Sequence, residues 1–328
     1  MSHQLSTDTT PFSAPSDGEV PIKIGLTVNP WAGKQLLKSD FEEMRCYLDE
    51  VAAAGFDYAE LGGCGLGVVI GGKVQRARVE ELRDALADCP LRLTLHSSWH
   101  SSGRTGNLLD TGSAATQRQG LLADLQIAGA IGAEVLVYHA GVLPNLYSDG
   151  DALTTGMATE RTMLRALADE AGTLGIMIAV ENRAPTSAVL TRRSYGMRLD
   201  LVAEQVQAID HPQVSMCLDV GHAYLAARYL RYDYLAAVQE VAPIVGHVHL
   251  HDNFGRMPRQ PDANPYELEL LGEGDLHLPP GWGTIPLADV LATPFPRDPA
   301  IIIEMRHARY YAEALATTRG LLEVRTRS

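Results

Sequence analysis

Cysteine, long apolar runs and positive charge are all scarce in this chain of 328 residues. Four cysteines are too few, and too irregularly spaced, for a disulfide framework or a Cys-x-x-Cys zinc site. No stretch approaches about 18 consecutive apolar residues, so the sequence predicts no membrane span. The cysteines are Cys46, Cys64, Cys89 and Cys217.

The charge balance is acidic, with 27 Lys and Arg against 40 Asp and Glu, or a net charge of −13. Nucleic-acid binding through phosphates requires a surplus of Lys and Arg on one face of the protein. The composition therefore argues against nucleic acid as a partner and favours a small-molecule substrate. A hydrophobic content of 46% is ordinary for a globular protein and argues against disorder.

The first 20 residues are polar and rich in Pro, Ser and Thr. They lack the basic and apolar regions that together make a signal peptide. We expect a flexible tail over residues 1–20, a catalytic domain over residues 21–328 and a cytoplasmic protein. The sequence leaves open whether the chain forms a homo-oligomer.

Short apolar runs recur along the chain and predict β-strands, while amphipathic patterns between them predict helices. The expected strands are Ile22–Val28, Phe56–Leu61, Leu91–His96, Glu134–His139, Ile176–Glu181, Val214–Asp219, Ile244–His249 and Ala300–Glu304. The expected helical faces include Phe41, Met44, Leu48 and Val51; Met163, Leu164, Leu167 and Ala171; and Leu199, Val202, Val206 and Ile209.

Eight strands that are apolar throughout, each followed by a helix or loop, indicate a parallel sheet covered on both faces. Eight such units close a (β/α)8 barrel. An open doubly wound sheet is the structural alternative, but no Gly-x-Gly-x-x-Gly follows the first strand. We therefore predict an α/β protein with a single TIM barrel. Its long connection between the seventh and eighth strands, about Asp252 to Pro299, is expected to be functional.

The last residue of each of six consecutive strands is a histidine or a carboxylate. In a TIM barrel these strand ends meet at one mouth, where active sites lie. Desolvating so many ionisable groups is costly unless they are paired or bound to metal. The six residues are His96, His139, Glu181, Asp219, His249 and Glu304.

Three further residues extend this candidate metal site. His222 follows Asp219 by three positions, and Asp275 and His277 alternate in the long connection. Alternate residues of an extended chain face the same side, so this pair could hold one ion together. Imidazoles and carboxylates without thiols suit Zn, Mn, Fe or Co. We expect one to three divalent ions per chain, with carboxylates such as Glu181 bridging them.

Several other residues are assigned with alternatives. Arg183 could stabilise charge on a substrate, and Trp99 and Trp282 could stack on a sugar ring or simply pack at the rim. Glu60 could support the metal ligands, contact substrate or be a surface charge. His251 follows His249 by two positions and is an open candidate ligand.

With these motifs in view, the chain resembles the xylose isomerase-like TIM-barrel superfamily from about Ile22 to Leu322. That superfamily includes sugar isomerases and epimerases, inosose-processing enzymes and endonuclease IV-type phosphodiesterases. By this resemblance, Glu181, Asp219, His249 and Glu304 match the single-metal quartet of ketose 3-epimerases. His222 matches their substrate-contacting histidine.

Other residues are similar to the endonuclease IV pattern, including ENRA, LDVGHAY and HLHDN. His96, His139 and Asp275-x-His277 ahead of Gly281-x-Gly283 stand where that family has additional ligands. The resemblance implies three ion sites. They are His96, His139 and Glu181; Glu181, Asp219, His249 and Glu304; and His222, Asp275 and His277. The acidic charge, and the absence of an obvious basic DNA-intercalating loop, put DNA in doubt as the substrate.

Two enzymatic functions remain, with Glu181, Glu304 and His222 as the expected catalytic residues of either. Hydrolysis of a small sugar or polyol phosphoester at clustered metals uses all nine ligands, and we favour it slightly. Isomerisation or epimerisation of a sugar or sugar phosphate needs one metal, with Glu181 and Glu304 exchanging a proton. A non-catalytic sugar-binding barrel is the third alternative.

Overall fold

The computed structural model describes residues 23–28, 41–63, 65–70, 73–97, 107–143, 150–185, 194–259 and 264–327. The expected N-terminal tail over residues 1–20 and the candidate substrate residue Trp99 lie outside these ranges.

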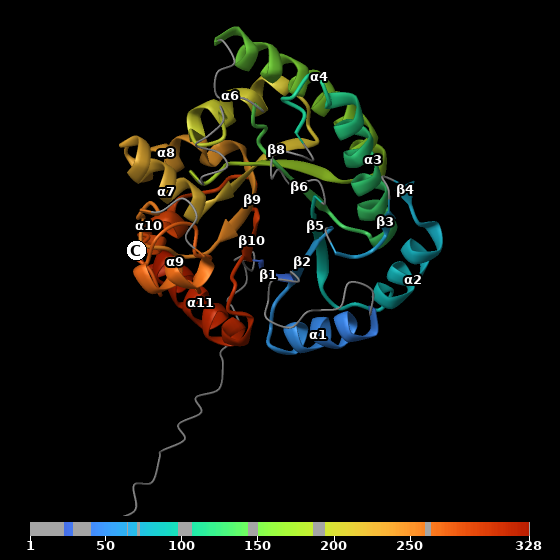
Figure 1. Ribbon diagram of the computed structural model, residues 1–328. Coiled ribbons are helices and arrows are strands. Elements are labelled where there is room, and N and C mark those ends of the chain that lie inside the picture. The colour runs from blue at the N-terminus through green and yellow to red at the C-terminus, as the bar shows by residue number, and fades with distance from the viewer. Residues whose placement is uncertain are drawn as a thin grey trace, which may run out of the picture.

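Eight parallel strands close into a barrel in the order β1-β10-β9-β8-β7-β6-β5-β2, confirming the predicted fold class (Figure 1). Each expected strand is present, and its ends differ from the prediction by no more than two residues. The barrel strands are β1 (Ile24–Val28), β2 (Tyr58–Gly62), β5 (Arg92–His96), β6 (Val135–His139), β7 (Met177–Glu181), β8 (Val214–Asp219), β9 (Val245–Leu250) and β10 (Ala300–Ile303).

Helices surround the barrel as an outer ring (Figure 1). The apolar spacings identified in the sequence face inward: α1 buries Phe41, Met44, Leu48 and Val51. The helices are α1 (Phe41–Ala53), α2 (Arg76–Leu86), α3 (Ala114–Ile131), α4 (Gly150–Leu174), α6 (Leu199–Ile209), α7 (Val220–Leu230), α8 (Tyr234–Val241), α9 (Pro265–Leu271), α10 (Leu287–Ala292) and α11 (Tyr311–Arg327), with short 3-10 turns η1 (Ala242–Ile244) and η2 (Ala308–Tyr310).

Barrel strands are buried on both faces, which explains why they are apolar throughout rather than alternating. Leu26, Leu95 and Leu218 are at most 1% exposed. Burying each such side chain contributes about 1.5–3 kcal/mol, so the barrel wall forms a rigid frame for polar groups at its mouth. Within the described part of the chain, none of the helices has the length and hydrophobicity needed to span a bilayer.

Two connections contain structure that the sequence did not predict. The glycine-rich segment after β2 forms a two-stranded hairpin, β3 (Val69–Ile70) with β4 (Lys73–Val74). The long connection between β9 and β10 contains α9 and α10, together with the segment that carries the predicted pair Asp275 and His277.

Candidate metal centre

Strand register brings the predicted residues together at the barrel mouth. His139 of β6 is the register partner of Glu181 in β7, and Asp219 of β8 is the partner of His249 in β9. Side chains at equal register on neighbouring parallel strands point to the same face. Apolar strands that end in an ionisable residue therefore produce a ring of such residues at the mouth.

Glu181 is the centre of the ring, and its side chain is fully buried. Its Oε2 lies 2.7 Å from Nε2 of His139 and 3.3 Å from Nε2 of His96. Its Oε1 lies 3.3 Å from Nδ1 of His222 and 3.5 Å from Nδ1 of His249. The two oxygens therefore face different sets of imidazoles, and the expected bridging of two ions by Glu181 stays a prediction.

We call Glu181, Asp219, His249 and Glu304 the quartet. Their candidate ligand atoms all lie within 4.8 Å of one another. Nδ1 of His249 lies 3.0 Å from Oε2 of Glu304 and 3.9 Å from Oδ2 of Asp219. Donors from β7, β8 and β9, and from the residue directly after β10, thus meet around one point.

Asp219 is held by its neighbours so that one oxygen remains available. It caps the N-terminus of α7, and its Oδ1 accepts from the backbone N–H of His222 at 2.6 Å. The same Oδ1 lies 3.1 Å from Nε2 of His251. Asn182 hydrogen-bonds both the backbone N–H and C=O of Asp219, which fixes the end of β8. Oδ2 is left facing the quartet.

We call His222, His251, Asp275 and His277 the loop cluster, because Asp275 and His277 come from the β9–β10 connection. Oδ2 of Asp275 lies 3.1 Å from Nε2 of His222 and 3.0 Å from Nε2 of His277. His251 stacks on His277 with ring centroids 4.1 Å apart. His277 has a φ of +49°, a strained conformation for a residue other than glycine, and such strain is concentrated at functional sites.

Asp252 anchors the segment that carries the loop cluster. Its carboxylate accepts from the backbone N–H groups of Gly281 at 3.0 Å and Ile285 at 3.1 Å. Its backbone also pairs with Leu278 in an isolated bridge. A Cβ at Gly283 would lie 2.3 Å from Oδ1 of Asp252, which explains why glycine is needed there. The Gly-x-Gly motif thus lets the connection close over Asp252.

The residues present fit a divalent metal. Among the described residues, buried atoms without a hydrogen-bond partner include both oxygens of Glu181, Oδ2 of Asp219, Nδ1 of His249 and Oδ1 of Asp275. Burying a polar atom without a hydrogen-bond partner costs free energy of folding. These atoms face other candidate ligand atoms rather than apolar side chains. Carboxylate oxygens and imidazole nitrogens are the donors that Zn, Mn, Fe and Co accept.

His96 and His139 have oppositely shifted pKa values, although their Nε2 atoms are only 3.2 Å apart. Burial lowers the pKa of His96, but contact with Glu181 outweighs it and raises the pKa to about 9. For His139, burial dominates over the same carboxylate and lowers the pKa to about 4. Without metal at neutral pH, His96 is therefore the protonated ring and His139 the neutral one, so an ion that binds His96 must displace a proton.

The pKa values of Glu181 and His249 are both shifted towards the charged form. Burial raises the pKa of Glu181, but the imidazoles of His139 and His249 outweigh it and hold that pKa well below its usual range. Burial lowers the pKa of His249, but neighbouring ionisable groups, including Glu60 and Glu181, raise it well above the ordinary value. The Glu181 carboxylate is therefore ionised at neutral pH.

The nine predicted ligands all lie in this centre, while the predicted substrate residues are placed differently. Arg183 is buried, and its Nε donates to the backbone oxygen of Ala140. Trp282 packs on Tyr310 with centroids 4.8 Å apart, and its Nε1 donates to Glu313. Rim packing is thus observed for Trp282, and sugar contacts by Arg183 or Trp282 stay predictions.

Four residues of the centre were missed or left open by the sequence: Glu60, His247, His251 and Asp252. Glu60 is 1% exposed, so the surface-charge alternative is wrong, and it contacts His247 and His249. His251 joins the loop cluster, and Asp252 anchors its segment. The alternation of His247, His249 and His251 along one strand was a usable signal that all three side chains share one face.

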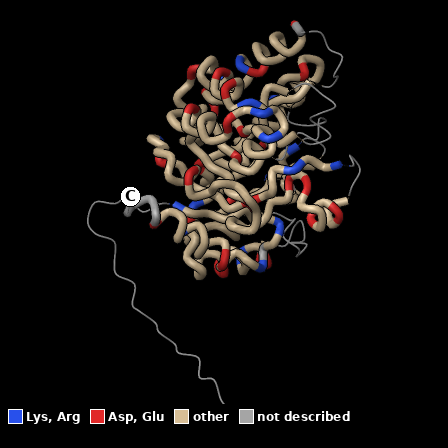
Figure 2. Tube along the Cα trace, turned by 90° about the vertical axis from the view of Figure 1, so that its left-hand side faces the viewer, with Lys and Arg blue, Asp and Glu red and all other residues tan. Residues whose placement is uncertain are grey.

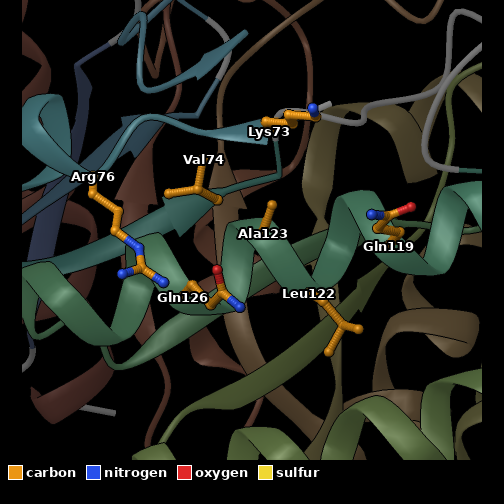
Figure 3. A pocket seen from close by; sticks show the side chains of 7 residues that line it. All are labelled: Lys73, Val74, Arg76, Gln119, Leu122, Ala123 and Gln126. Atoms are coloured by element: carbon orange, nitrogen blue, oxygen red, sulfur yellow. The ribbon is translucent and has the colours of Figure 1, made fainter. Parts of the chain in front are cut away.

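A separate cavity of about 420 Å³ lies between the β3–β4 hairpin and α3 (Figure 3). The cavity is lined by Lys73, Val74, Arg76, Gln119, Leu122, Ala123 and Gln126. None of the candidate ligands lines it, so the metal centre is a distinct feature.

Figure 2 shows acidic and basic residues interspersed along the described chain.

The fold and this centre define a TIM-barrel protein with a candidate metal site at its mouth. The chain belongs to the xylose isomerase-like TIM-barrel family, whose model matches residues 48–321. No curated protein matches the chain in sequence. The endonuclease IV-like ligand set stays a prediction.

Solved structures with the same architecture include three epimerase-type proteins. A D-tagatose 3-epimerase-like protein is 20% identical, with a TM-score of 0.69 over 93% of this chain and 98% of that one. D-psicose 3-epimerase from Clostridium cellulolyticum H10 is 15% identical, with a TM-score of 0.64 over 92% and 99%. A 3-keto-D-glucoside 4-epimerase from E. coli is 17% identical, with a TM-score of 0.61 over 92% and 100%. At these identities the likeness shows a shared fold.

Proposed function

We propose that this protein is a metal-dependent sugar isomerase or epimerase. The observation that carries the proposal is that Glu181 and Glu304 both approach Nδ1 of His249, at 3.5 and 3.0 Å. Two carboxylates therefore face one candidate ion site. The sugar epimerases among the structural neighbours support this function over phosphoester hydrolysis, which the sequence alone had slightly favoured.

The quartet would hold the ion. When bound, a divalent ion supplies Lewis acidity that polarises adjacent carbonyl and hydroxyl oxygens of a sugar and acidifies the C–H between them. Glu304 has a side chain 14% exposed, whereas that of Glu181 is fully buried. Burial raises the pKa of Glu304, but the imidazoles of His277 and His249 outweigh it and lower that pKa, so this carboxylate is ionised before substrate binds.

The two carboxylates would divide the proton transfer. Oε2 of Glu304 faces His249, while Oε1 has a longer 3.7 Å contact to Nδ1 of His277. We assign Oε1 of Glu304 to exchange the substrate proton from one side. Glu181 would act from the other side, as the second member of the pair. A catalytic role for His222 stays a prediction, because its Nε2 is directed at Asp275.

A small phosphoester hydrolase is the second candidate, and one observation favours it. The quartet adjoins both the loop cluster and the group His96, His139 and Glu181, so the mouth offers donors for more than one ion. Clustered ions suit phosphoryl transfer because they stabilise both the attacking and the leaving oxygen.

Solvent-deuterium exchange into a panel of ketoses and sugar phosphates tests the proposal. We expect the metal-loaded protein to incorporate deuterium at one carbon, and Glu304→Gln to abolish the exchange while the protein stays folded. Absence of exchange across the panel, together with phosphate release from sugar phosphates and two or three tightly bound ions, would establish the hydrolase instead.

A further inference from the structure

Glu60 lies below the quartet, inside the barrel. It comes from β2 and is 1% exposed. Its Oε2 accepts a hydrogen bond from Oγ1 of Thr94 at 3.0 Å and lies 2.8 Å from Nε2 of His247. Its Oε1 lies 2.9 Å from Nε2 of His249. A buried carboxylate from β2 thus reaches two imidazoles of β9.

Each nitrogen of His249 lies close to a carboxylate: Nε2 is 2.9 Å from Oε1 of Glu60, and Nδ1 is 3.0 Å from Oε2 of Glu304. An ionised carboxylate can only accept hydrogen bonds, and a metal-bound imidazole is neutral. With Glu181 and Glu304 turned towards a bound ion, Glu60 is the carboxylate left to accept from the ring N–H of His249. A neutral imidazole has one N–H, and a proton on Nε2 leaves the lone pair on Nδ1. Nδ1 is the atom that faces Glu304 and Glu181 in the quartet.

We propose that Glu60 is a positioning residue of the metal centre, which fixes the orientation and the Nε2–H tautomer of His249 so that Nδ1 binds the ion. A carboxylate behind a metal-bound imidazole also increases the basicity of that ligand. The inference rests on the quartet assigned in the proposed function, and it adds a residue from β2, a strand that contributes no quartet member.

Direct binding of an ion by Glu60 is the competing arrangement. Glu60, His247 and His249 have ligand atoms within 4.8 Å of one another. Three donors are one fewer than a closed tetrahedral site needs, and the carboxylate makes direct contacts of 2.8 and 2.9 Å with both imidazoles. The contacts therefore favour positioning.

Cobalt titration of the metal-free full-length protein tests the assignment without any substrate. We expect Glu60→Gln to weaken Co²⁺ binding at the quartet by about 10- to 100-fold and to change its visible absorption spectrum, with the number of sites unchanged. Thr94→Val is the matched control, because it removes one hydrogen bond to the same carboxylate but leaves its charge and its contact with His249. It should change the affinity less than threefold.

Nitrogen NMR of the wild-type, zinc-loaded protein provides a measurement that does not depend on a variant folding. We expect His249 to show a protonated Nε2 and a metal-shifted Nδ1. Wild-type cobalt affinity in Glu60→Gln, a protonated Nδ1 in His249, or loss of one whole site from Glu60→Gln at unchanged affinity elsewhere would each overturn the proposal. None of these results depends on sugar turnover, so the two proposals fail separately.

Discussion

The quartet and the loop cluster are neighbouring groups of similar residues, but the barrel supports them very differently. Glu181, Asp219 and His249 come from strand ends and have fully buried side chains. Asp275 and His277 come from the β9–β10 connection, and their side chains are 17% and 14% exposed. The strands themselves hold the quartet, whereas the loop residues depend on the Asp252 anchor.

The different support of the two groups bears on which of them the proposed reaction requires. An isomerase needs the quartet alone, whereas a hydrolase with clustered ions needs both groups. A rigid support favours residues whose positions must hold during reaction. We therefore expect damage to the quartet to be far more severe than damage to the loop cluster.

Glu181→Gln should have the largest effect, because this carboxylate faces imidazoles on both sides. We expect the turnover of a sugar substrate to fall by about 10³-fold or more, since acid–base catalysis contributes about 10²–10⁴ and a metal ligand is also lost. Steady-state kinetics and metal content measure both losses. Circular dichroism is the control for folding, and activity within about tenfold of wild type would contradict the assignment.

Metal affinity should rise with pH between about 6.5 and 9. Burial lowers the pKa of His96, but Glu181 raises it to about 9, so an ion must displace a proton below that pH. One displaced proton corresponds to up to about tenfold in affinity per pH unit. Chelator competition across this range measures the slope.

The stability of the metal-free protein should change with pH in the opposite direction to metal affinity, falling as the pH rises. A raised histidine pKa stabilises the fold fully below the unfolded value near 6.5, and this contribution is lost as pH rises through about 9. Urea unfolding of the metal-free protein should therefore show lower stability at pH 9 than at pH 6.5 from this group. For the preceding prediction, a metal affinity that does not change between pH 6.5 and pH 9 would contradict the role of His96.

Asp252→Ala tests the support of the loop cluster. Three backbone N–H groups, those of Asn253, Gly281 and Ile285, lose their acceptor, and we expect a loss of about 1–3 kcal/mol in the free energy of unfolding. Asp49→Ala is the matched control, because Asp49 pairs with Arg45 on the surface of α1 and its side chain is 54% exposed. Exposed pairs contribute about 0–1 kcal/mol, so equal effects in the two variants would be inconsistent with an anchoring role.

His277→Ala should have the smallest effect on sugar turnover, which we expect to remain within about tenfold of wild type. The imidazole lies 3.0 Å from Asp275 and outside the quartet. Initial rates on the ketose that shows deuterium exchange measure it, with His211→Ala as a control, because His211 contacts Asp169 rather than any candidate ligand. A loss as large as that of Glu181→Gln would favour the hydrolase.

The sequence predicted the barrel and the nine candidate ligands because both depend on local patterns. An apolar run that ends in His, Asp or Glu shows where a strand stops and which side chain reaches the mouth. Leu199, Val202, Val206 and Ile209 likewise have the spacing of one helix face, and α6 buries all four.

The supporting residues could not be predicted, because their partners are distant in the chain. Glu60 and His247 are 187 positions apart, and closure of the barrel brings them into contact. His251 acquires a role only when the β9–β10 connection folds back to stack His277 on it. In the sequence, Asp252 is one more polar residue after a strand. Its anchoring role depends on backbone N–H partners that lie 29 and 33 positions further along the chain.

Helix α9 buries none of its residues, and Tyr266 and Leu270 are each 85% exposed. Its own capping box, between Asn264 and Glu267, satisfies its first turn locally. The segment from Asn264 to Gly272 can therefore be lengthened, shortened or exchanged with little cost to the barrel, while Asp252 holds Asp275 and His277 in register. Changes in this segment could therefore alter substrate specificity while the barrel and the metal centre stay the same.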